Sequence, residues 1–528
     1  MSTMPTSRTI PALLDEQAGR FGEREAVVAG ARRLTYTALR DEVRRTAKGL
    51  SALGIQRGDH VAILMGNRIE WVLAFFALQQ LGATSVGLNT WATPREMEYA
   101  LSHAEVTCLI AVDRFRRNDY QAMIAGMHPR ATLLPKLRHL VWVAADPQAP
   151  PAANGPGDTT WEAMVALGRD LPDATIDEAA RQARPEDVGM LLYTSGSTAA
   201  PKGILLQQGN WILNAFNIGE RQKVTEADRL WLAVSLFWSF GCVNAMPNLI
   251  SHGGCVVLQE HFDAAEALSL IERERCTILY GTPNMVQALV EHPARATHDL
   301  SSLRSGAMIG TPEQLMGAVA LGASKICNVY GLSETYGNCA VIDADEPLEV
   351  RLQSVGAPLA GVTVRICDMV TGAVLPAGEV GEIRVKGPLF REYYKDEAKT
   401  REAFDADGYF HTGDLGTLDA AGRLYYRGRL KEMVKSGGIN IAPIEVEETL
   451  MRHPAVRSAY VIGVPDKSLD EILVAFIVPA AGAATTAEEL RQFCKKELAA
   501  YKVPAHFRFT TDAELPLTTT GKLQKMKL

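Results

Sequence analysis

The apolar and polar residues of the N-terminal region alternate with a helical period. Four apolar residues recur every three or four positions, as on one face of a helix: Leu39, Val43, Ala47 and Leu50. Thr37 is the predicted N-cap, because a threonine hydroxyl accepts a backbone N–H at a helix start, and Gly54 is the predicted stop.

A short, wholly apolar run comes next. Residues 61–65 (VAILM) predict a buried strand, and an apolar helix through Phe75 and Phe76 follows it. The stretch WVLAFFAL (71–78) ends after eight residues at two glutamines, whereas a membrane-spanning helix needs about 20. Strand–helix alternation continues over about 400 residues, which predicts an α/β fold with largely parallel sheets.

The pattern changes near Arg429. Two short strands follow (SAYVIGV and ILVAFIV), and after them comes a helix with a predicted capping box of Thr486 and Glu489. These elements predict a separate α+β domain of about 100 residues. We place the boundary between residues 1–429 and residues 430–528. The junction GRLKEMVKSGG ends in two glycines, which suit a hinge as well as an ordinary linker.

Composition narrows the class of protein. The chain has 528 residues, a net charge of −7 and eight cysteines without a CxxC pair. The negative net charge argues against a basic surface that binds nucleic acid. The separate cysteines argue against a disulfide framework and a structural zinc site. The first residues lack the apolar segment of a signal peptide. We therefore expect a soluble cytoplasmic protein without a membrane span, and the sequence leaves its oligomeric state open.

One polar loop carries the candidate chemistry. The stretch YTSGSTAAPKG (193–203) combines hydroxyl groups, glycines and Lys202, which together suit the oxygens of a phosphate group. The usual phosphate loop, GxxxxGK[ST], is absent, since leucine follows Gly521 and Lys522. By itself the stretch fits either a phosphate loop or a solvated turn.

Further motifs follow in a fixed order: NVYGLSET (328–335), GEIRVKGP (381–388), GYFHTGDLG (408–416), YRGRLKEMVKSGGINIAPIEVE (426–447) and PLTTTGKLQK (516–525). With the loop, this series resembles the adenylate-forming superfamily over nearly the whole chain, and its acyl/aryl-CoA ligase branch most. The resemblance implies an acetyl-CoA synthetase-like fold, with a large N-terminal α/β domain of several subdomains and a small mobile α+β lid. It implies ATP, Mg²⁺ and coenzyme A as cofactors and a small carboxylic acid as substrate.

The resemblance also implies a role for each motif. The β- and γ-phosphates would be held by the loop residues Thr194, Ser195, Gly196, Ser197, Thr198 and Lys202. Ala199 stands where the family usually has glycine, which makes the loop stiffer or differently bent if that position needs a positive φ. Glu334 would be the Mg²⁺ ligand and a catalytic residue. The adenine would lie among Gly306, Ala307, Asn328, Tyr330, Gly331 and Ser333.

The remaining implied roles lie toward the C-terminus. Asp414 and Arg429 would bind the ribose hydroxyls. Lys522 would bridge the carboxylate and the α-phosphate during adenylation, and Lys431 would be the hinge. The lid's other face would bring Lys435, Ser436, Gly437 and Gly438 to the thioester-forming step, although for Lys435 a solvated loop is an equal alternative.

The acid itself is only partly specified. Residues 229–259 contain no Asp or Glu to pair with a substrate ammonium, which disfavours amino acids. The predicted pocket residues are Trp238, Phe240, Gly241 and Tyr336, with Tyr280–Pro283 and Ile309 as further walls and Val243 and Met246 as core. They predict an acid with an uncharged aromatic, alicyclic or medium-chain tail. Two alternatives stay open: an acyl-AMP ligase that loads a carrier protein, and a nucleotide-binding regulator with reduced catalysis.

The assignment of Lys522 predicts a split between the two half-reactions. Lys522→Ala should abolish most acid-dependent pyrophosphate release, because two anions would then approach without a screening cation. Thioester formation from supplied acyl-AMP and coenzyme A should continue at a rate near that of the wild type. Equal loss in both assays would contradict the assignment.

Overall fold

The computed structural model describes residues 3–127, 129–149, 151–153, 155–194, 201–436, 439–466, 469–517 and 523–528. These residues form two compact units. One comprises Met1–Val362 and Lys386–Phe404, and the other comprises Thr363–Val385 and Asp405–Leu528.

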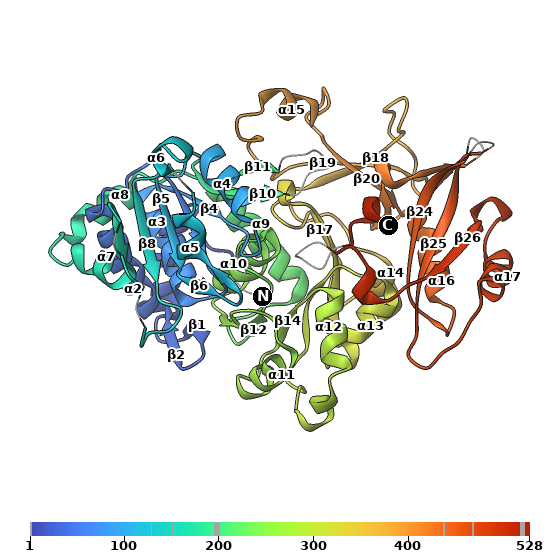
Figure 1. Ribbon diagram of the computed structural model, residues 1–528, viewed down its shortest axis with the longest axis horizontal. Coiled ribbons are helices and arrows are strands. Elements are labelled where there is room, and N and C mark those ends of the chain that lie inside the picture. The colour runs from blue at the N-terminus through green and yellow to red at the C-terminus, as the bar shows by residue number, and fades with distance from the viewer. Residues whose placement is uncertain are drawn as a thin grey trace. The chain divides into compact units, whose positions relative to one another are not determined.

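Two parallel-rich sheets build the first unit (Figure 1). Among the described residues, one has the order β17 (Ala340–Val341), β16 (Lys325–Tyr330), β15 (Ser305–Met308), β14 (Ile278–Tyr280), β12 (Arg229–Leu232), β13 (Cys255–Leu258), β1 (Glu25–Ala29) and β2 (Arg32–Thr35). The other has the order β11 (Lys202–Gln207), β10 (Val188–Thr194), β4 (Thr84–Gly87), β3 (His60–Leu64), β5 (Cys108–Val112), β8 (His139–Val143) and β9 (Asp158–Thr160). Neighbours are parallel except at the pairs β16–β17, β1–β2 and β10–β11. The predicted α/β fold with largely parallel sheets is confirmed.

Helix α3 (Ile69–Leu81) is buried on every side. All of its residues except Glu70 are buried, as expected for a helix that is apolar all round. The apolar stretch ends at Gln79 and Gln80 as predicted, and the helix itself continues through both glutamines to Leu81. Inside the core the Gln79 amide donates through Nε2 to the Gly189 carbonyl at 3.0 Å, whereas its Oε1 has no partner among the described residues.

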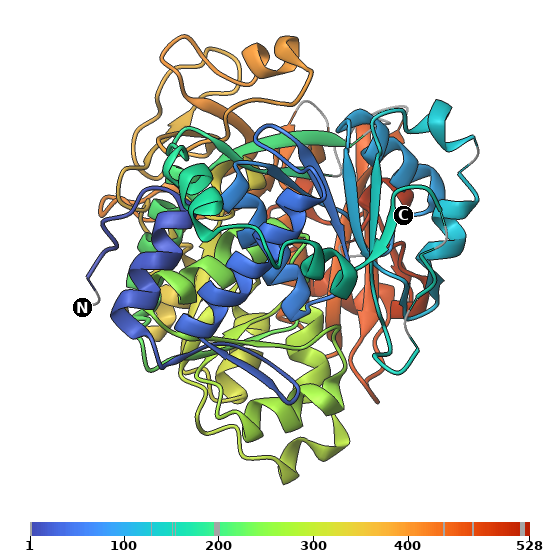
Figure 2. The same ribbon diagram turned by 90° about the vertical axis from the view of Figure 1, so that its left-hand side faces the viewer.

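The N-terminal helices α1 (Ile10–Phe21), α2 (Tyr36–Ala52) and α3 pack against one another (Figure 2). The amphipathic face predicted for α2 is buried, including Leu39 and Val43. The predicted N-cap is wrong by two residues. Thr35, at the end of β2, accepts the Ala38 N–H through its hydroxyl at 3.1 Å and so starts the helix.

The second unit contains two further sheets. One is antiparallel, with the order β18 (Thr363–Cys367), β19 (Gly381–Lys386), β20 (Phe410–Leu418) and β21 (Leu424–Arg429). The other has the order β23 (Ile439–Ile441), β22 (Val434–Ser436), β25 (Asp470–Pro479) and β24 (Val456–Asp466), with β26 (His506–Phe509) paired to β25. Helices α16 (Pro443–Met451) and α17 (Ala487–Glu497) pack against each other beside this sheet, and the Thr486–Glu489 capping box is confirmed. The α+β prediction therefore holds, whereas the boundary at residues 429 and 430 stays a prediction about which part moves.

A partly buried ion pair fixes the end of the chain in this unit. Glu447 on α16 is 8% exposed and accepts the Val461 N–H at 2.6 Å. Lys525 donates to the same carboxylate at 2.6 Å. Burial raises the pKa of Glu447, and Lys525 opposes that rise. The carboxylate therefore depends on this one cation more than a surface carboxylate would.

Replacing Lys525 should destabilise this unit in a pH-dependent way. With Lys525→Met the pKa of Glu447 rises further above its usual value of 4.5, so stability is retained at low pH and lost as the pH rises through the folded-state pKa. We expect a loss of about 3 kcal/mol at pH 8 and less at pH 5, measured by hydrogen exchange of the β24 and β25 amides. Adding Glu447→Gln should recover most of the loss at pH 8. An equal loss at both pH values would contradict the pairing.

Candidate nucleotide and acyl site

The predicted phosphate loop joins two paired strands. Strands β10 and β11 are antiparallel, with Tyr193 opposite Gly203 and Thr194 opposite Lys202. Thr194 and Lys202, which stand at opposite ends of the loop, are therefore neighbours across the two strands. The other predicted phosphate ligands, Ser195, Gly196, Ser197 and Thr198, lie outside the described residues, as does Ala199.

Helix α4 (Pro94–His103) holds both ends of this loop. Tyr99 donates its hydroxyl to the Pro201 carbonyl at 3.3 Å, and His103 Nδ1 lies 2.8 Å from the Tyr193 hydroxyl. Burial and the nearby Lys395 lower the pKa of His103, so its ring is neutral at pH 7. One turn of helix separates Tyr99 from His103, and the spacing of the two strand ends is therefore set by a rigid element.

Residues 390–394 connect the loop to the segment that carries Glu334. The Tyr394 N–H donates to the Gly203 carbonyl at 2.8 Å, which extends the pairing along the edge of β11. The Phe390 N–H donates to the Glu334 carbonyl at 2.8 Å. This short segment therefore contacts both predicted phosphate-site elements within one compact unit.

Tyr393 lies between the two predicted ionic groups. Its hydroxyl donates to Glu334 Oε1 at 2.9 Å, and the Lys202 Nζ lies 4.7 Å from the centre of its ring. Burial raises the pKa of Tyr393, and the charge of Glu334 raises it further, so the hydroxyl stays protonated and remains a donor. The ring face attracts the ammonium group while the hydroxyl holds the carboxylate.

The Glu334 carboxylate fits a magnesium ion. It is partly buried, and a carboxylate that accepts one hydroxyl retains lone pairs for a cation. Magnesium is commonly held by one or two carboxylates together with substrate phosphates and water. The pairing with Tyr393 fixes where that carboxylate points.

The predicted adenine residues lie on neighbouring strands. Gly306 and Ala307 are in β15, Asn328 and Tyr330 end the parallel strand β16, and Gly331 and Ser333 follow them. In parallel sheets ligands bind outside the carboxyl ends of the strands, where Asn328 and Tyr330 stand.

The two glycines of this set are also required by the backbone. A Cβ at Gly306 would lie 1.9 Å from the Leu279 carbonyl oxygen, and one at Gly331 would lie 2.4 Å from the Gly337 carbonyl oxygen. A glycine is therefore needed at both positions even without a ligand.

The second unit carries the predicted ribose and lid residues. Asp414 in β20 is opposite Arg429 in β21, and Arg429 Nε lies 3.6 Å from Asp414 Oδ1. Lys431 belongs to the short 3-10 helix η4 (Leu430–Glu432), and β22 contains Lys435 and Ser436. Gly437, Gly438 and Lys522 lie outside the described residues.

The predicted acyl residues gather around a π-helix, η1 (Ser239–Ala245). Trp238 precedes it, and the ring of Phe240 packs 5.1 Å from that of Tyr280. A Cβ at Gly241 would lie 2.5 Å from the Ser235 carbonyl oxygen, so this glycine makes way for backbone, which gives no support to its predicted role of leaving room for substrate. Val243 and Met246 are fully buried, as predicted for core residues.

Tyr336 and Ile309 lie differently from the predicted pocket wall. Tyr336 is fully buried, and its hydroxyl accepts the Gln207 N–H at 2.7 Å, so its phenol is bound to the end of β11. Ile309 is 54% exposed. Neither placement supports a wall around an acyl tail.

Comparison with known proteins identifies the family. The AMP-binding enzyme family matches residues 14–394, and the AMP-binding enzyme C-terminal domain matches residues 445–522. The chain belongs to the AMP-binding enzyme family.

Its relatives place it in the acyl-CoA ligase branch. It is 35% identical over 99% of its length to a 3-[(3aS,4S,7aS)-7a-methyl-1,5-dioxo-octahydro-1H-inden-4-yl]propanoyl:CoA ligase of Mycobacterium tuberculosis, covering 98% of that protein. It is 32% identical over 99% of its length to a medium-chain acyl-CoA ligase, ACSF2, of Danio rerio, covering 88% of that protein. The solved anthranilate CoA ligase AuaEII, in complex with anthranoyl-AMP, superposes with a TM-score of 0.87 at 29% identity, over 99% of this chain and 97% of that one. This AMP-binding enzyme is thus an AMP-forming acyl-CoA ligase, an acid–thiol ligase.

Sequence reasoning missed three residues of this AMP-binding enzyme: Tyr99, His103 and Tyr393. Tyr393 follows the GEIRVKGP motif by five residues, so its position within the family pattern was an available signal. Tyr99 and His103 lie on an ordinary amphipathic helix, and nothing in their spacing distinguishes them from surface residues. No helix in the described part of the chain is long and apolar enough to cross a membrane.

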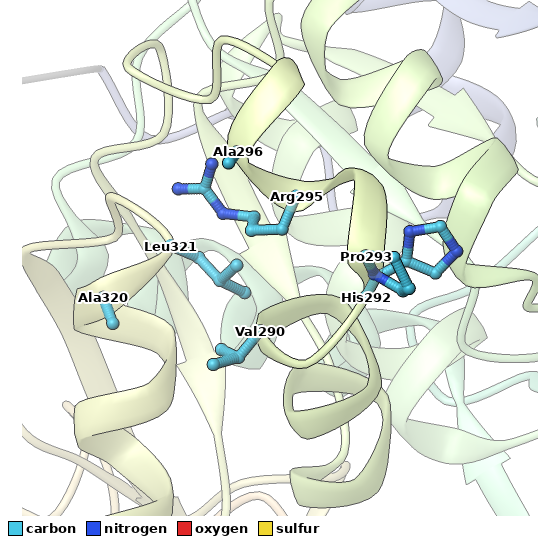
Figure 3. Close-up of a pocket in the computed structure, with 7 residues that line it drawn as sticks. All are labelled: Val290, His292, Pro293, Arg295, Ala296, Ala320 and Leu321. Carbon is cyan, nitrogen blue, oxygen red and sulfur yellow. The ribbon is translucent and has the colours of Figure 1, made fainter.

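A separate hollow lies at the ends of α12 (Pro283–Val290) and α13 (Pro312–Ala320) (Figure 3). Val290, Pro293 and Leu321 line it, together with His292 and Arg295. None of the predicted site residues lines this hollow.

The position of Tyr393 predicts a magnesium-linked effect on ATP binding. Tyr393→Phe keeps the ring beneath Lys202 but removes the donor to Glu334. It should therefore raise the Mg²⁺ concentration needed for half-maximal ATP binding roughly tenfold, as expected for one hydrogen bond to a charged group. Tyr393→Leu should weaken ATP binding further, because the cation–π contact is lost as well. Calorimetric titration with ATP at several Mg²⁺ concentrations measures both.

The neighbouring tyrosine supplies a matched control. Tyr394 donates its hydroxyl to Glu105 at 3.3 Å, away from Glu334. Tyr394→Phe should leave the Mg²⁺ dependence unchanged. If Tyr393→Phe behaves like this control, its hydroxyl does not hold the carboxylate in place.

Proposed function

We propose that this acyl-CoA ligase activates an acid with an uncharged aromatic, alicyclic or medium-chain tail and transfers it to coenzyme A. In the first step a carboxylate oxygen attacks the α-phosphorus of ATP, and the bond to pyrophosphate breaks. In the second step the coenzyme A thiol loses its proton, its sulfur attacks the acyl carbon, and AMP leaves. The thioester is the product.

The observation that carries this proposal is the series Lys202, Tyr393 and Glu334 in one compact unit. It presents an ammonium group for phosphate oxygens and a held carboxylate for the cation that accompanies them. A magnesium ion there would neutralise phosphate charge. Lys202 adds a fixed positive charge, and Tyr393 keeps Glu334 oriented without itself ionising.

The uncharged tail is supported by the composition of the acyl region. Residues 230–259 contain no Lys, Arg, Asp or Glu. A charged tail buried there would lack a counter-ion, which costs several kcal/mol. The acids named for the relatives include an aromatic, a bicyclic and a medium-chain one.

The roles of the lid residues remain part of the proposal. We propose that Lys522 acts in the first step and that rotation about Lys431 replaces it with the face that carries Lys435. Asp414 and Arg429 would hold the ribose in both steps, since a carboxylate and a guanidinium can bind the two hydroxyls of a sugar.

A panel of acids tests this function. Purified protein with ATP, Mg²⁺, coenzyme A and a panel of aromatic, alicyclic, aliphatic, amino and dicarboxylic acids should release pyrophosphate, and AMP rather than ADP. We expect turnover with the uncharged-tail acids and at least a hundredfold lower kcat/KM with the amino acids, because an unpaired ammonium group would have to be buried. Lys202→Met should suppress release for every acid. Formation of ADP, or a preference for amino acids, would overturn the proposal.

The acceptor is tested in the same assay. Coenzyme A should accept the acyl group, whereas a holo carrier protein should not compete with it. Faster transfer to the carrier would instead indicate an acyl-AMP ligase.

A further inference from the structure

Two buried side-chain amides near η1 contain atoms that have no hydrogen-bond partner among the described residues. Asn338 is 0% exposed, and neither its Oδ1 nor its Nδ2 is bonded. Asn244 is also 0% exposed, and its Nδ2 is not bonded. Fully buried polar atoms are almost always paired in native proteins, so such a concentration needs an explanation.

The two amides come from segments in contact. Asn244 is in η1, and a Cβ at Gly337 would lie 3.3 Å from both Cβ and Nδ2 of Asn244. Ser333 donates its hydroxyl to the Ser239 hydroxyl at 3.0 Å, which ties the start of η1 to the same segment. The amide of Asn244 thus lies against the residue that precedes Asn338.

The surrounding bonds hold both residues in place. Asn244 Oδ1 accepts the Tyr280 hydroxyl at 2.9 Å, and the oxygen of Tyr280 in turn accepts Gln222 at 2.7 Å. This chain fixes which end of the Asn244 amide is the unpaired donor. The backbone carbonyl of Asn338 accepts the Asn214 amide at 2.9 Å, so the backbone is anchored while the side chain is not bonded.

Buried amides with unpaired atoms would destabilise the protein if their role were only structural. An unpaired buried amide costs about 1–3 kcal/mol, and leucine, of similar size, would avoid that cost. A π-helix is likewise a less stable form of backbone that occurs mostly at functional sites. Both features stand in the region where the acyl tail is expected, and both are accounted for if a ligand supplies the missing partner.

We propose that the acid activated by this enzyme carries a neutral oxygen on its tail, a keto or hydroxyl group, which pairs with Asn338 and Asn244. The inference rests on the proposed function, because it concerns the tail of the same acid. The Nδ2 groups of the two residues donate to the oxygen, and Asn338 Oδ1 accepts a hydrogen bond from it when that oxygen is a hydroxyl. A charged group is disfavoured, since residues 230–259 contain no Lys, Arg, Asp or Glu.

Matched pairs of acids test this on the wild-type protein. Each pair shares a carbon skeleton and differs only in the tail oxygen: 4-oxocyclohexanecarboxylate with cyclohexanecarboxylate, and 5-oxohexanoate with hexanoate. For the pair that is used best, we expect a kcat/KM for pyrophosphate release at least tenfold higher with the oxo acid, because a site built to bond oxygen rejects the analogue that lacks it. Equal use, as expected if a resident water fills the amides, overturns the inference, and so does preference for the hydrocarbon acid.

A variant locates the effect. Asn338→Leu should remove the preference, lowering kcat/KM for the oxo acid at least tenfold while keeping or raising that for the hydrocarbon acid. Retained turnover of the hydrocarbon acid shows that the variant is folded. Asn217→Leu, which removes an amide that donates to the Ala360 carbonyl on the outside of α9 (Gln208–Gln222), should leave the ratio unchanged.

The two proposals fail in different ways. If no acid of any class releases pyrophosphate, the proposed function fails. If uncharged acids are activated without regard to the tail oxygen, or if Asn338→Leu leaves the ratio as it was, only the present inference fails.

Discussion

The Tyr394 N–H donates to the Gly203 carbonyl at 2.8 Å, and this bond lays residues 390–394 along the edge of β11. A sheet edge offers unpaired backbone groups to any extended segment that reaches it. Here the segment also bonds the Glu334 carbonyl through Phe390. Tyr393 is thereby carried between Lys202 and Glu334, which are far apart in the chain. If this pairing were lost, Tyr393 would no longer be held between the cation and the carboxylate.

The two ends of the phosphate loop are also held by other elements of the fold. Tyr99 and His103 come from one face of α4, whose N-terminus is fixed by a capping box of Thr93 and Glu96. A rigid helix thus sets the spacing of Pro201 and Tyr193, and the antiparallel register of β10 and β11 sets the pairing of Thr194 with Lys202. The positions of Thr194 and Lys202 at the two ends of the loop are therefore set by the surrounding elements.

The acyl region is built differently from the phosphate loop. Its apolar residues are packed as core, as with Val243 and Met246, and its glycine at position 241 yields space to the Ser235 backbone. What distinguishes it from an ordinary core is the set of buried amides on η1 and after Glu334. Unpaired buried amides reduce the stability of the free protein. A ligand that forms hydrogen bonds with them restores that stability, so the stability of the fold depends on which substrate is bound.

The sequence by itself determined the features that depend on local pattern or on a motif kept in order. These are the α/β class, the parallel sheets, the cap at Thr486 and the family. Each of these features depends either on residues that are close together in the sequence or on short motifs in a fixed order. Both kinds of signal can be recognised in the sequence alone. The cap at Thr37 was placed two residues late because Thr35 and Thr37 offer the same hydroxyl, and only the end of β2 decides between them.

The tertiary structure alone decided which residues support the site. Tyr393 has no signature of its own, since an aromatic side chain is as common in a core as beside an ion. Its role arises because a sheet edge, a lysine and a glutamate converge on it. Asn244 and Asn338 are ordinary polar residues in the sequence, and their importance appears only when burial removes water and the surrounding bonds prove to be incomplete. Hydrogen-bond partners and burial both depend on contacts between segments that are distant in the sequence. A pattern of residues along the chain therefore does not reveal them.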